Sequence, residues 1–473
     1  MTGPAAGAAK RLSELLADVA EHAPEVLGSL PTPPTDEQAD PVITAVAHEH
    51  HVVTPGALFV ARRGERFDAH DYIDEAIAAG AAAIVGERPT GKYEVLYLSV
   101  PSARRALPHL AAALYGHPSA RLRVIGVTGT DGKTTTSFLL HWVLSQRQKT
   151  GLISTAGIRL DADELPTLGH FTTPEATDVQ RLLASFVAAG ATHAVLESSS
   201  HGFSLNRLDA VRYETGVVTN LSPEHLDHHK TLAAYLEAKA TLLRRSRRAV
   251  INLDDEHHRP FRAAAREAGA EIVTYGQSAD ADVRIGEVAS VPGGLVFTVS
   301  TGGAETTLRL PMLGAYNAWN AAAAVAAALP EGVTLEAAAA RLTDFGGVPG
   351  RMQVIQAEPF TVVVDFAHTA PALAKALAAV RPPAGRVIVV SGAAGERDPG
   401  KRAPLGRAAV EGADFAIFTE EDSRSEPFAD IAGELTRGAT EAGGAEGRRF
   451  VVVPDRTAAI AEAFTRAAPG DVV

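Results

Sequence analysis

The sequence predicts an α/β protein with three domains. From about residue 118, near-continuous apolar strands such as RVIGVTG and THAVLES alternate with helical segments, which predicts a mostly parallel sheet covered on both faces. At 473 residues, the chain is too long for a single hydrophobic core. Near residues 347–352 (GVPGRM) the rhythm breaks, and a further α/β pattern starts. We therefore expect domains at residues 1–116, 117–347 and 348–473.

The first domain is expected to mix short strands and helices. Residues 54–62 (TPGALFVAR) predict a turn followed by a strand, and residues 69–87 predict a helix followed by a strand. The proline-rich residues 30–41 predict a loop or linker. Near the start, GPAAGAAKRLSELLADVAEH predicts a modest amphipathic helix and does not resemble a signal peptide.

Composition excludes several classes of function. The net charge is −12 and the pI is near 5.8, which argues against nucleic acid as a main partner because phosphate binding needs a basic face. The absence of cysteine excludes disulfides, thiolate metal sites and a thiol nucleophile. No run of 18 apolar residues occurs, so no membrane span is expected. A cytoplasmic protein is the default expectation.

Polar clusters repeatedly follow the apolar strands. GTDGKT comes after residues 124–127, ESSSH after 193–196, TNLSPEH after 215–218 and DFAH after 361–364. In open α/β sheets, ligands bind beyond the carboxyl ends of the strands. Polar loops follow strands in any protein, but that alternative does not explain the concentration of Lys, His, Asp and Glu. We therefore expect a site along this edge.

The segment VIGVTGTDGKTTTSFLL (residues 124–140) is a candidate phosphate loop with unusual spacing. Five residues separate Gly126 from Gly132, one more than in a standard P-loop. The loop follows a strand and opens a helix, so backbone N–H groups at the helix N-terminus would point at phosphates. Lys133 can reach the terminal phosphates, and the Thr134 hydroxyl can ligate Mg²⁺. A plain glycine-rich turn would not need Lys-Thr at the helix start.

Lys239 occupies an unexpected place on its predicted helix. A period of 3.6 residues puts Leu232, Leu236, Lys239 and Leu243 in one narrow stripe. Burial of an unpaired lysine disfavours its charge and lowers its pKa, and a neutral amine in a closed site can react with CO₂ to form a carbamate. The alternative is a lysine whose ammonium reaches out of the stripe into water.

Several motifs resemble those of a known family. GTDGKTTT resembles the ATP-binding loop of Mur ligases and folylpolyglutamate synthases, with Asp131 where asparagine is usual. Further matches follow in family order over most of the chain: FTTPEATD (171–178), LESSSHG (196–202), NLSPEH, LGAYNAWNAAAA (313–324), VPGRMQVI, VVDFAHTAPAL and SGAAGERDPGKRAPLG. FTTPEATD and LESSSHG favour the Mur ligase branch that adds a third amino acid to a UDP-muramoyl dipeptide.

The resemblance implies an N-terminal uridine-binding domain, a central P-loop ATPase domain and a C-terminal Rossmann-like ligase domain. ATP would phosphorylate a carboxylate of UDP-N-acetylmuramoyl-L-alanyl-D-glutamate, and the amine of a free amino acid would displace the phosphate. Transfer of a phosphoryl group to a carboxylate gathers anionic groups, so Mg²⁺ and cationic side chains are expected. The same resemblance implies a monomer that acts in peptidoglycan precursor synthesis.

The resemblance also assigns individual residues. The catalytic residues would be Lys133, Lys239, Glu197, His225, Arg351 and His368, with Lys239 carried as N6-carboxylysine. The metal ligands would be Thr134, Glu197 and His225. ATP would be bound by Gly129, Thr130, Asp131, Gly132, Lys133, Thr134, Thr135, Asn317, Asn320, Arg351, Asp365 and His368. The other substrates would be bound by Thr172, Thr173, Pro174, Ser199, Arg207, Glu421, Asp422 and Arg424.

Each assignment has a plainer alternative. Glu197 could be a surface or helix-capping acid, and Asn317 with Asn320 could be polar surface on an alanine-rich helix. His228 and His229, next to His225, are expected to be solvated or structural. In the C-terminal segment GERDPGKR, part of the charge run is expected to be only solvated.

The chain departs from the family pattern in three places. His48-Glu49-His50-His51 stands where His-Asp-Ser-Arg is usual, which predicts an altered uridine pocket. Glu421-Asp422-Ser423-Arg424 stands where enzymes adding meso-diaminopimelate carry Asp-Asn-Pro-Arg. The added acids favour L-lysine or L-ornithine, whereas Arg424 favours a distal carboxylate. The sequence ends at APGDVV, before the Gly-Lys-Gly-His-Glu that family members carry. We therefore expect the C-terminal domain to lack its usual end.

Two other functions compete with the tripeptide-forming ligase. One is a related ligase with another acceptor, of the folylpolyglutamate synthase type, which the extra N-terminal domain disfavours. The other is a degenerate Mur-like scaffold that binds nucleotide without turnover. The intact GKT sequence, Glu197, Lys239 and His368 argue against that loss.

Overall fold

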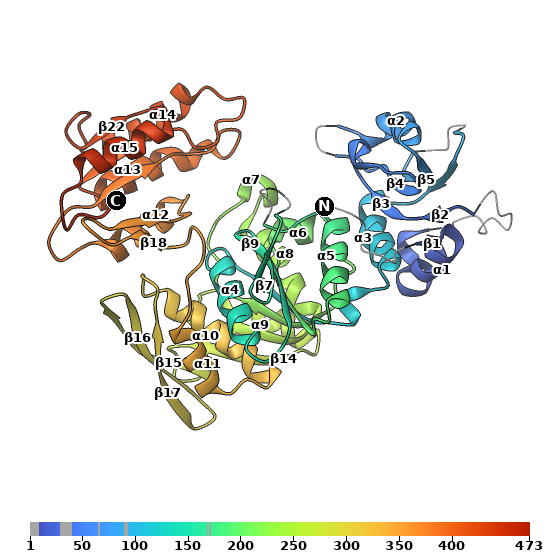
Figure 1. Ribbon diagram of the computed structural model, residues 1–473, viewed down its shortest axis with the longest axis horizontal. Coiled ribbons are helices and arrows are strands. Elements are labelled where there is room, and N and C mark those ends of the chain that lie inside the picture. Colours follow the sequence, from blue (N-terminus) through green and yellow to red (C-terminus); the bar gives the residue numbers. More distant parts are fainter. Residues whose placement is uncertain (1–8, 29–39, 65–66, 89–92, 168, 170–171) are drawn as a thin grey trace. The chain divides into compact units, whose positions relative to one another are not determined.

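The computed structural model describes the chain except for residues 1–8, 29–39, 65–66, 89–92, 168 and 170–171. The predicted linker at 30–41 therefore lies almost wholly outside the described residues. The chain forms two compact units, whose elements Figure 1 colours by their position in the sequence. One contains residues 1–284 and 322–338, and the other contains residues 285–321 and 339–473.

A parallel four-stranded sheet forms the N-terminal part of the first unit. Its strand order is β3-β4-β5-β6, and side chains alternate between its two faces. Leu58 and Val60 pack with α1 and α3 in one apolar core, whereas Phe59 packs with α2 in another. The predicted strand and the predicted helix–strand pair are confirmed. The elements are α1 (Leu12–His22), β3 (Ala45–Ala47), β4 (Ala57–Val60), α2 (Ile73–Ala78), β5 (Ala81–Gly86), β6 (Leu96–Ser99) and α3 (Ala103–Leu114).

A larger sheet forms the central part of the first unit. The strands β8, β11, β7, β12, β13 and β14 pair in that order and all run parallel, as predicted, while β9 and β10 are antiparallel at one edge. The chain leaves β7 to one side and later returns on the other side at β12, which creates a topological switch point at β7. The strands are β7 (Arg123–Thr128), β8 (Thr150–Ser154), β9 (Gly157–Leu160), β10 (Asp163–Leu165), β11 (His193–Glu197), β12 (Tyr213–Val218), β13 (Ser246–Asn252) and β14 (Glu271–Gly276).

Helices cover this sheet and bury its apolar strands. Val124, Ile125 and Val127 of β7 are fully buried, because a strand with helices on both faces has no wet side. The helices are α4 (Lys133–Leu144), α5 (Ala176–Ala188), α6 (Ser200–Ser204), α7 (Leu226–His229), α8 (Leu232–Arg244), α9 (His258–Glu267), α10 (Asn317–Ala328) and α11 (Leu335–Thr343). Among the described residues, none of the helices has the length and apolarity that crossing a membrane requires.

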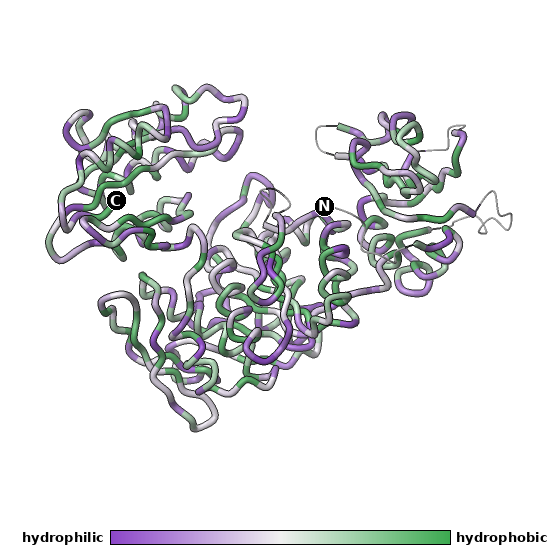
Figure 2. The backbone as a smooth tube through the Cα atoms, viewed as in Figure 1, coloured by the Kyte–Doolittle hydropathy of each residue, from purple (hydrophilic) through white to green (hydrophobic). Residues whose placement is uncertain are grey.

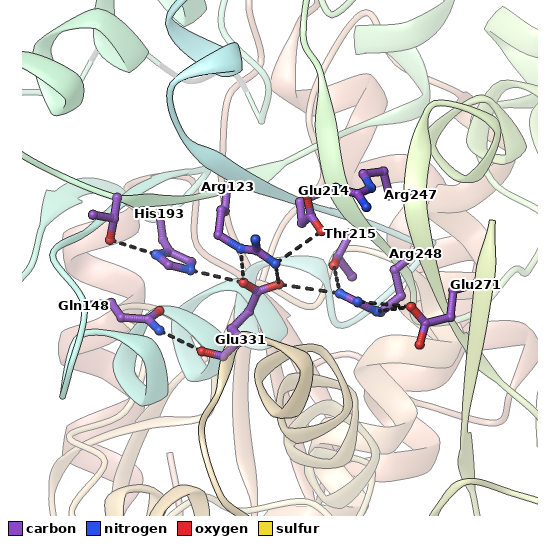
Figure 3. Close-up of polar contacts among 10 residues, drawn as sticks. Arg123, Gln148, His193, Glu214, Thr215, Arg247, Arg248, Glu271 and Glu331 are labelled. Carbon is purple, nitrogen blue, oxygen red and sulfur yellow. Dashed lines mark hydrogen bonds and ion pairs between the residues drawn. The ribbon is translucent and has the colours of Figure 1, made fainter.

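Glu331 holds the amino-terminal edge of this sheet together. Its side chain is fully buried and accepts hydrogen bonds from Arg123 at the start of β7 and from His193 Nε2 at 3.2 Å (Figure 3). Arg248 of β13 lies 3.7 Å away. Three strands therefore share one carboxylate, which is supplied by the short 3₁₀ turn Leu329–Glu331 after α10. This edge is opposite to the one at which the predicted site lies.

The second unit contains a hairpin and a Rossmann-like region. β16 (Gly294–Thr301) and β17 (Ala304–Leu310) pair antiparallel, as do β18 (Gln353–Gln356) and β19 (Val362–Val364). β20 (Ile388–Ser391), β21 (Phe415–Phe418) and β22 (Phe450–Val452) form a parallel sheet. Hydrophobic stretches, green in Figure 2, run through this region. One face packs on α12 (Ala370–Val380), α13 (Arg402–Gly412) and α14 (Phe428–Glu441), and the other on α15 (Arg456–Arg466).

Candidate active site

The loop after β7 has the shape that a phosphate-binding loop needs. Gly129 has a φ of 151° and Gly132 has a φ of 81°, so both use backbone conformations that suit glycine. A Cβ atom on Gly129 would lie 1.8 Å from Thr219 Oγ1, so no other residue fits there. α4 begins at Lys133, directly after the loop, and the free N–H groups at a helix N-terminus are donors suited to anions.

Asn220, which follows β12, fixes the loop's backbone. Its Oδ1 accepts from the N–H of Asp131 at 2.9 Å, its Nδ2 donates to the carbonyl of Asp131 at 3.0 Å, and its own carbonyl accepts from Thr130 N at 3.0 Å. The side chain of Asp131 is exposed. The amide of Asn220 thus bonds the backbone N–H and carbonyl of residue 131. These contacts do not depend on the side chain at that position.

Lys133 and the threonines around it lie on the same loop. Lys133 Nζ donates to the carbonyls of Gly129 and Thr130 at 3.1 and 2.9 Å. Thr130 Oγ1 donates to the carbonyl of Ser222 at 3.1 Å. Thr134 and Thr135 are buried in the first turn of α4.

Thr134 and Glu197 form a hydrogen-bonded pair. Thr134 Oγ1 donates to the two carboxylate oxygens of Glu197 at 2.9 and 3.1 Å, and Glu197 is 1% exposed. The alternative of a surface acid is therefore wrong. Ser154 Oγ and the N–H of Thr155 also donate to this carboxylate, at 2.5 and 2.9 Å. These buried oxygen donors are the kind that Mg²⁺ prefers, so the residues present fit that ion.

His225, the third predicted metal ligand, sits in a group of aromatic side chains. Its Nε2 lies 3.6 Å from Glu224, and its ring contacts those of His201 and Tyr235 at centroid distances of 4.7 and 6.1 Å. Burial, together with the neighbouring imidazoles, lowers the pKa of His201 to about 3. Of the three predicted metal ligands, Thr134 and Glu197 are therefore hydrogen-bonded to each other. His225 instead contacts Glu224, His201 and Tyr235.

His228 and His229 have structural contacts. His229 is buried and its Nε2 lies 3.0 Å from Ser200 Oγ, while His228 Nε2 lies 2.9 Å from Ser204 Oγ. These contacts support the structural alternative for both residues.

Lys239 is buried in α8, as its helical stripe predicts. It is 1% exposed, its Nζ donates to the carbonyl of Gly129 at 2.5 Å, and the same Nζ lies 4.3 Å from the centre of the Tyr235 ring. The alternative in which the ammonium reaches into water is therefore wrong. Burial, aided by the charge of Lys133, holds the pKa of Lys239 well below its usual value. The neutral amine that a carbamate requires is favoured here.

Tyr235 is a residue that the sequence interpretation missed. It is fully buried, and its hydroxyl lies 3.3 Å from Thr130 Oγ1 while its ring contacts Lys239. It stands four residues before Lys239, so the same helical period could have placed it on the buried stripe. Leu232 and Leu236, which the helical period also places on that stripe, are only partly buried.

The predicted substrate-binding residues of the first unit lie together beside Glu197. Thr173 Oγ1 donates to the backbone carbonyl of Glu197 at 2.9 Å and lies 2.9 Å from Ser199 Oγ. Arg207 Nη1 donates to the carbonyl of Thr173 at 2.9 Å. Thr172 and the buried Pro174 flank Thr173 in the chain.

The altered N-terminal signature forms a cluster of rings and acids. The ring of His50 stacks on that of Tyr72, with centroids 4.5 Å apart and planes 5° apart. His51 Nε2 lies 3.2 Å from Glu49. His48 is buried, and burial together with the charge of Arg62 lowers its pKa.

In the second unit, Arg351, Asp365 and His368 gather around Phe366. Arg351 lies over the Phe366 ring at 4.3 Å, and the His368 ring centroid is 5.1 Å from that of Phe366. Asp365 accepts from the N–H groups of Met352 and Ala367 at 2.8 and 2.9 Å. Phe366 is 53% exposed and was missed, although an aromatic side chain between Asp365 and His368 was a usable signal.

Asn317 and Asn320 bond to each other at the start of α10. Asn320 Nδ2 donates to Asn317 Oδ1 at 2.8 Å, and Asn317 Nδ2 donates to the carbonyl of Leu313 at 2.7 Å. Both are buried, so the alternative of ordinary polar surface is wrong.

The loop at residues 421–424 exposes three charged side chains. Glu421 and Asp422 are exposed acids, and Arg424 Nε lies 3.4 Å from Asp422 Oδ2. Nearby, Arg402 is 3% exposed and pairs with Glu426 at 2.6 Å, so it is a structural residue and not part of a solvated charge run.

The fold and the site define a class of protein. A phosphate loop at the switch point of a parallel sheet, followed by a helix whose second residue bonds a buried acid, is typical of P-loop nucleotide-binding proteins. The extra residue between Gly126 and Gly132 sets this loop apart from the standard form.

Comparison with known proteins identifies the family. Residues 43–115 match "Mur ligase family, catalytic domain", residues 127–328 "Mur ligase middle domain", and residues 350–473 "Mur ligase, glutamate ligase domain". The chain is 48% identical over 454 residues to UDP-N-acetylmuramyl-tripeptide synthetase of Deinococcus radiodurans, which covers 94% of this chain and 91% of the relative. It is 38% identical to UDP-N-acetylmuramoyl-L-alanyl-D-glutamate–2,6-diaminopimelate ligase of Geobacillus kaustophilus, covering 92% and 89% of the two chains.

Solved structures agree. A structure of a UDP-N-acetylmuramoyl-L-alanyl-D-glutamate–2,6-diaminopimelate ligase is 32% identical, with a TM-score of 0.65 and coverage of 91% of this chain and 88% of the other. A Mycobacterium tuberculosis folylpolyglutamate synthase is 18% identical, with a TM-score of 0.64 over 76% of this chain and 90% of the other, which shows a shared fold alone. The chain belongs to the Mur ligase family, whose members are ATP-dependent ligases, and the predicted resemblance and three-domain α/β architecture are confirmed.

Proposed function

We propose that this protein joins a diamino acid to UDP-N-acetylmuramoyl-L-alanyl-D-glutamate, using ATP and Mg²⁺, in peptidoglycan precursor synthesis. One observation carries the proposal. The carboxylate of Glu197 bonds Thr134 of the phosphate-loop helix, while its backbone carbonyl bonds Thr173 of the proposed substrate channel. One residue at the end of β11 therefore connects the nucleotide side of the site with the acceptor side.

The chemistry assigns a role to each group. The acceptor carboxylate attacks the γ-phosphorus of ATP, ADP leaves, and the amine then attacks the acyl carbon so that phosphate departs. The loop N–H groups and Lys133 hold the phosphates during the first step. Thr134 and Glu197 would hold Mg²⁺, which neutralises anionic charge when bound. Thr173, Ser199 and Arg207 hold the acceptor, and Lys239 acts as its carbamate.

The remaining proposed residues belong to the second unit and to the histidine group. We assign His225 to metal binding, Arg351 and His368 to the phosphates, and Asp365 to the ribose, on the family resemblance. Asn317 and Asn320, which are buried and bonded to each other, are assigned to adenine. On the same family resemblance, we place the reaction in the cytoplasm and expect a monomer to suffice.

The loop at residues 421–424 supports a preference for L-lysine or L-ornithine. Arg424 is the residue that would grip a distal carboxylate, but Asp422 lies 3.4 Å from it and offsets its charge. Glu421 adds a further exposed negative charge. An ammonium group suits this surface better than the carboxylate of meso-diaminopimelate does.

Phosphate release tests this function. We expect ATP-dependent release only with UDP-N-acetylmuramoyl-L-alanyl-D-glutamate, at a higher kcat/KM with L-lysine or L-ornithine than with meso-diaminopimelate. Lys133→Ala, which removes a phosphate contact, is the inactive control. Turnover with a folate acceptor and glutamate would favour the folylpolyglutamate-type ligase. Tight ATP binding without turnover on any acceptor would favour the scaffold.

Asp131 is expected to be nearly neutral for ATP binding. Asp131→Asn should change the Kd for MgATP by less than about threefold, because an exposed carboxylate is well screened and Asn220 holds the backbone of residue 131, not its side chain. Isothermal titration calorimetry measures the effect. Binding that is far tighter in the asparagine variant would show instead that the acid weakens this loop.

A further inference from the structure

A glutamate joins two arginines from distant parts of the first unit. Glu175 stands just before α5, Arg62 follows β4 of the N-terminal sheet, and Arg207 follows α6. Arg62 Nη1 lies 2.7 Å from Glu175 Oε2, and Arg207 Nη2 lies 2.6 Å from Glu175 Oε1. Each carboxylate oxygen therefore binds one guanidinium.

The three side chains are largely buried. The exposed fractions are 17% for Arg62, 14% for Glu175 and 13% for Arg207. Burial alone would raise the pKa of Glu175, but the two arginines outweigh it and hold the pKa below its usual range. Charges this poorly hydrated depend on one another, so removal of the shared carboxylate leaves two guanidiniums without their partner.

This ionic contact continues into the proposed active site. Arg207 donates through its other terminal nitrogen to the carbonyl of Thr173, whose hydroxyl bonds the backbone of Glu197. Glu175 thus fixes one end of Arg207 while Thr173 fixes the other. Arg62 reaches the same carboxylate from the N-terminal sheet, 113 residues away in the chain.

The charge balance of the group favours an anionic ligand. Two guanidiniums share one carboxylate, which leaves one positive charge beside Thr173 and Ser199. A UDP-linked dipeptide carries a diphosphate and carboxylates, and arginine recognises both through paired N–H donors.

We propose that Glu175 is a positioning residue that holds Arg62 and Arg207 as a two-arginine clasp for the anionic UDP-muramoyl dipeptide. This inference rests on the proposed function. Arg207 lines the acceptor channel by family resemblance, whereas Glu175 and Arg62 have been assigned no role. The clasp acts on binding of the acceptor and not on binding of ATP.

Glu175→Gln tests the clasp, because it keeps the shape and removes the charge. We expect the Kd and KM for UDP-N-acetylmuramoyl-L-alanyl-D-glutamate to rise at least about tenfold, while the KM for ATP changes less than about twofold. Asp178→Asn is the matched control, since Asp178 lies in the first turn of α5, three residues after Glu175, but pairs with Arg181 at 2.9 Å. That control should leave both KM values within about twofold of the wild type.

Two more variants keep the test decisive. Glu175→Asp retains the charge but shortens the side chain, and Arg62→Gln removes one arm. Both should raise the acceptor Kd less than Glu175→Gln does, and they carry the comparison if Glu175→Gln does not fold. Equal changes in the KM values for ATP and acceptor, or no change in either, would overturn the clasp.

Failure of the proposed function is distinguishable from failure of this inference. If the wild type turns over the dipeptide but the variants bind it as tightly, only the clasp is wrong. If the wild type binds the dipeptide without turnover, the clasp can still be tested, because the Kd for the dipeptide should be higher in Glu175→Gln than in the wild type. If the wild type neither binds nor converts it, both are wrong.

Discussion

Lys239→Ala is expected to lower ATP-dependent amide formation about 100-fold to 1000-fold, the usual cost of removing one group that stabilises transition-state charge. Lys239 is buried next to the phosphate loop, and its lowered pKa favours the neutral amine that takes up CO₂. The carbamate converts this neutral amine into an anion next to the phosphate loop, and the proton is released. Initial rates of phosphate release with the dipeptide acceptor measure the loss.

Rescue separates the carbamate from a simple packing defect. Short carboxylic acids such as acetate should restore part of the activity of Lys239→Ala, because they supply the missing carboxylate in the space left by the side chain. A ¹³C carbamate signal should appear in the wild type under ¹³CO₂ and be absent from the variant. Lys375→Ala, an exposed position on α12, is the matched control and should keep full activity. Unchanged activity in Lys239→Ala would contradict the proposal that Lys239 acts as a carbamate.

Glu331→Gln is expected to cost about 3–5 kcal/mol of unfolding free energy, the range for breaking a buried ion pair from one side. The side chain of Glu331 is 0% exposed and accepts from Arg123 and His193, with Arg248 nearby (Figure 3). The amide leaves these donors without their shared negative charge at the edge where β7, β11 and β13 begin. Urea-induced unfolding of the full chain measures the effect.

The pH dependence gives this prediction a second check. Burial alone would raise the pKa of Glu331, but His193 and Arg123 outweigh it and the pKa is lowered. A carboxyl whose folded pKa is depressed stabilises the fold above its unfolded pKa and loses that contribution as the pH falls through the folded value. The stability gap between wild type and Glu331→Gln should therefore be full at pH 7 and narrow below about pH 4.

A control on the neighbouring helix completes the design. Glu336→Gln changes an exposed acid near the start of α11 and should alter stability by less than about 0.5 kcal/mol. If Glu331→Gln is no more destabilising than Glu336→Gln, the shared carboxylate does not hold the sheet edge.

Local sequence patterns were sufficient for much of the site. The strand–loop–helix order and the glycines of GTDGKT predicted the phosphate loop, and the structure shows the left-handed backbone that Gly132 requires. The 3.6-residue period placed Lys239 on a buried stripe, where it lies. Polar residues after the parallel strands predicted one edge, and there Thr134 bonds Glu197 while Asn220 bonds Asp131. The prediction was wrong for DFAH, which follows β19 of a separate antiparallel pair in the second unit.

Contacts between distant segments could not be predicted in this way. Glu331 lies 208 residues from Arg123, and Glu175 lies 113 residues from Arg62. The residues next to Glu331 and Glu175 in the sequence do not indicate that either acid is buried or which arginine it contacts. The same holds for Asn220, whose amide acts on a loop 89 residues earlier.

The sequence by itself determined the class of this protein, because phosphate loops, helical stripes and buried strands depend on neighbours a few residues apart. It also determined the family, through motifs that occur in a fixed order. Only the tertiary structure decided which charges are buried, and what each one contacts. Desolvation and ion pairing depend on packing between distant segments, so the clasp at Glu175, the shared carboxylate of Glu331 and the lowered pKa of Lys239 exist only in the folded chain.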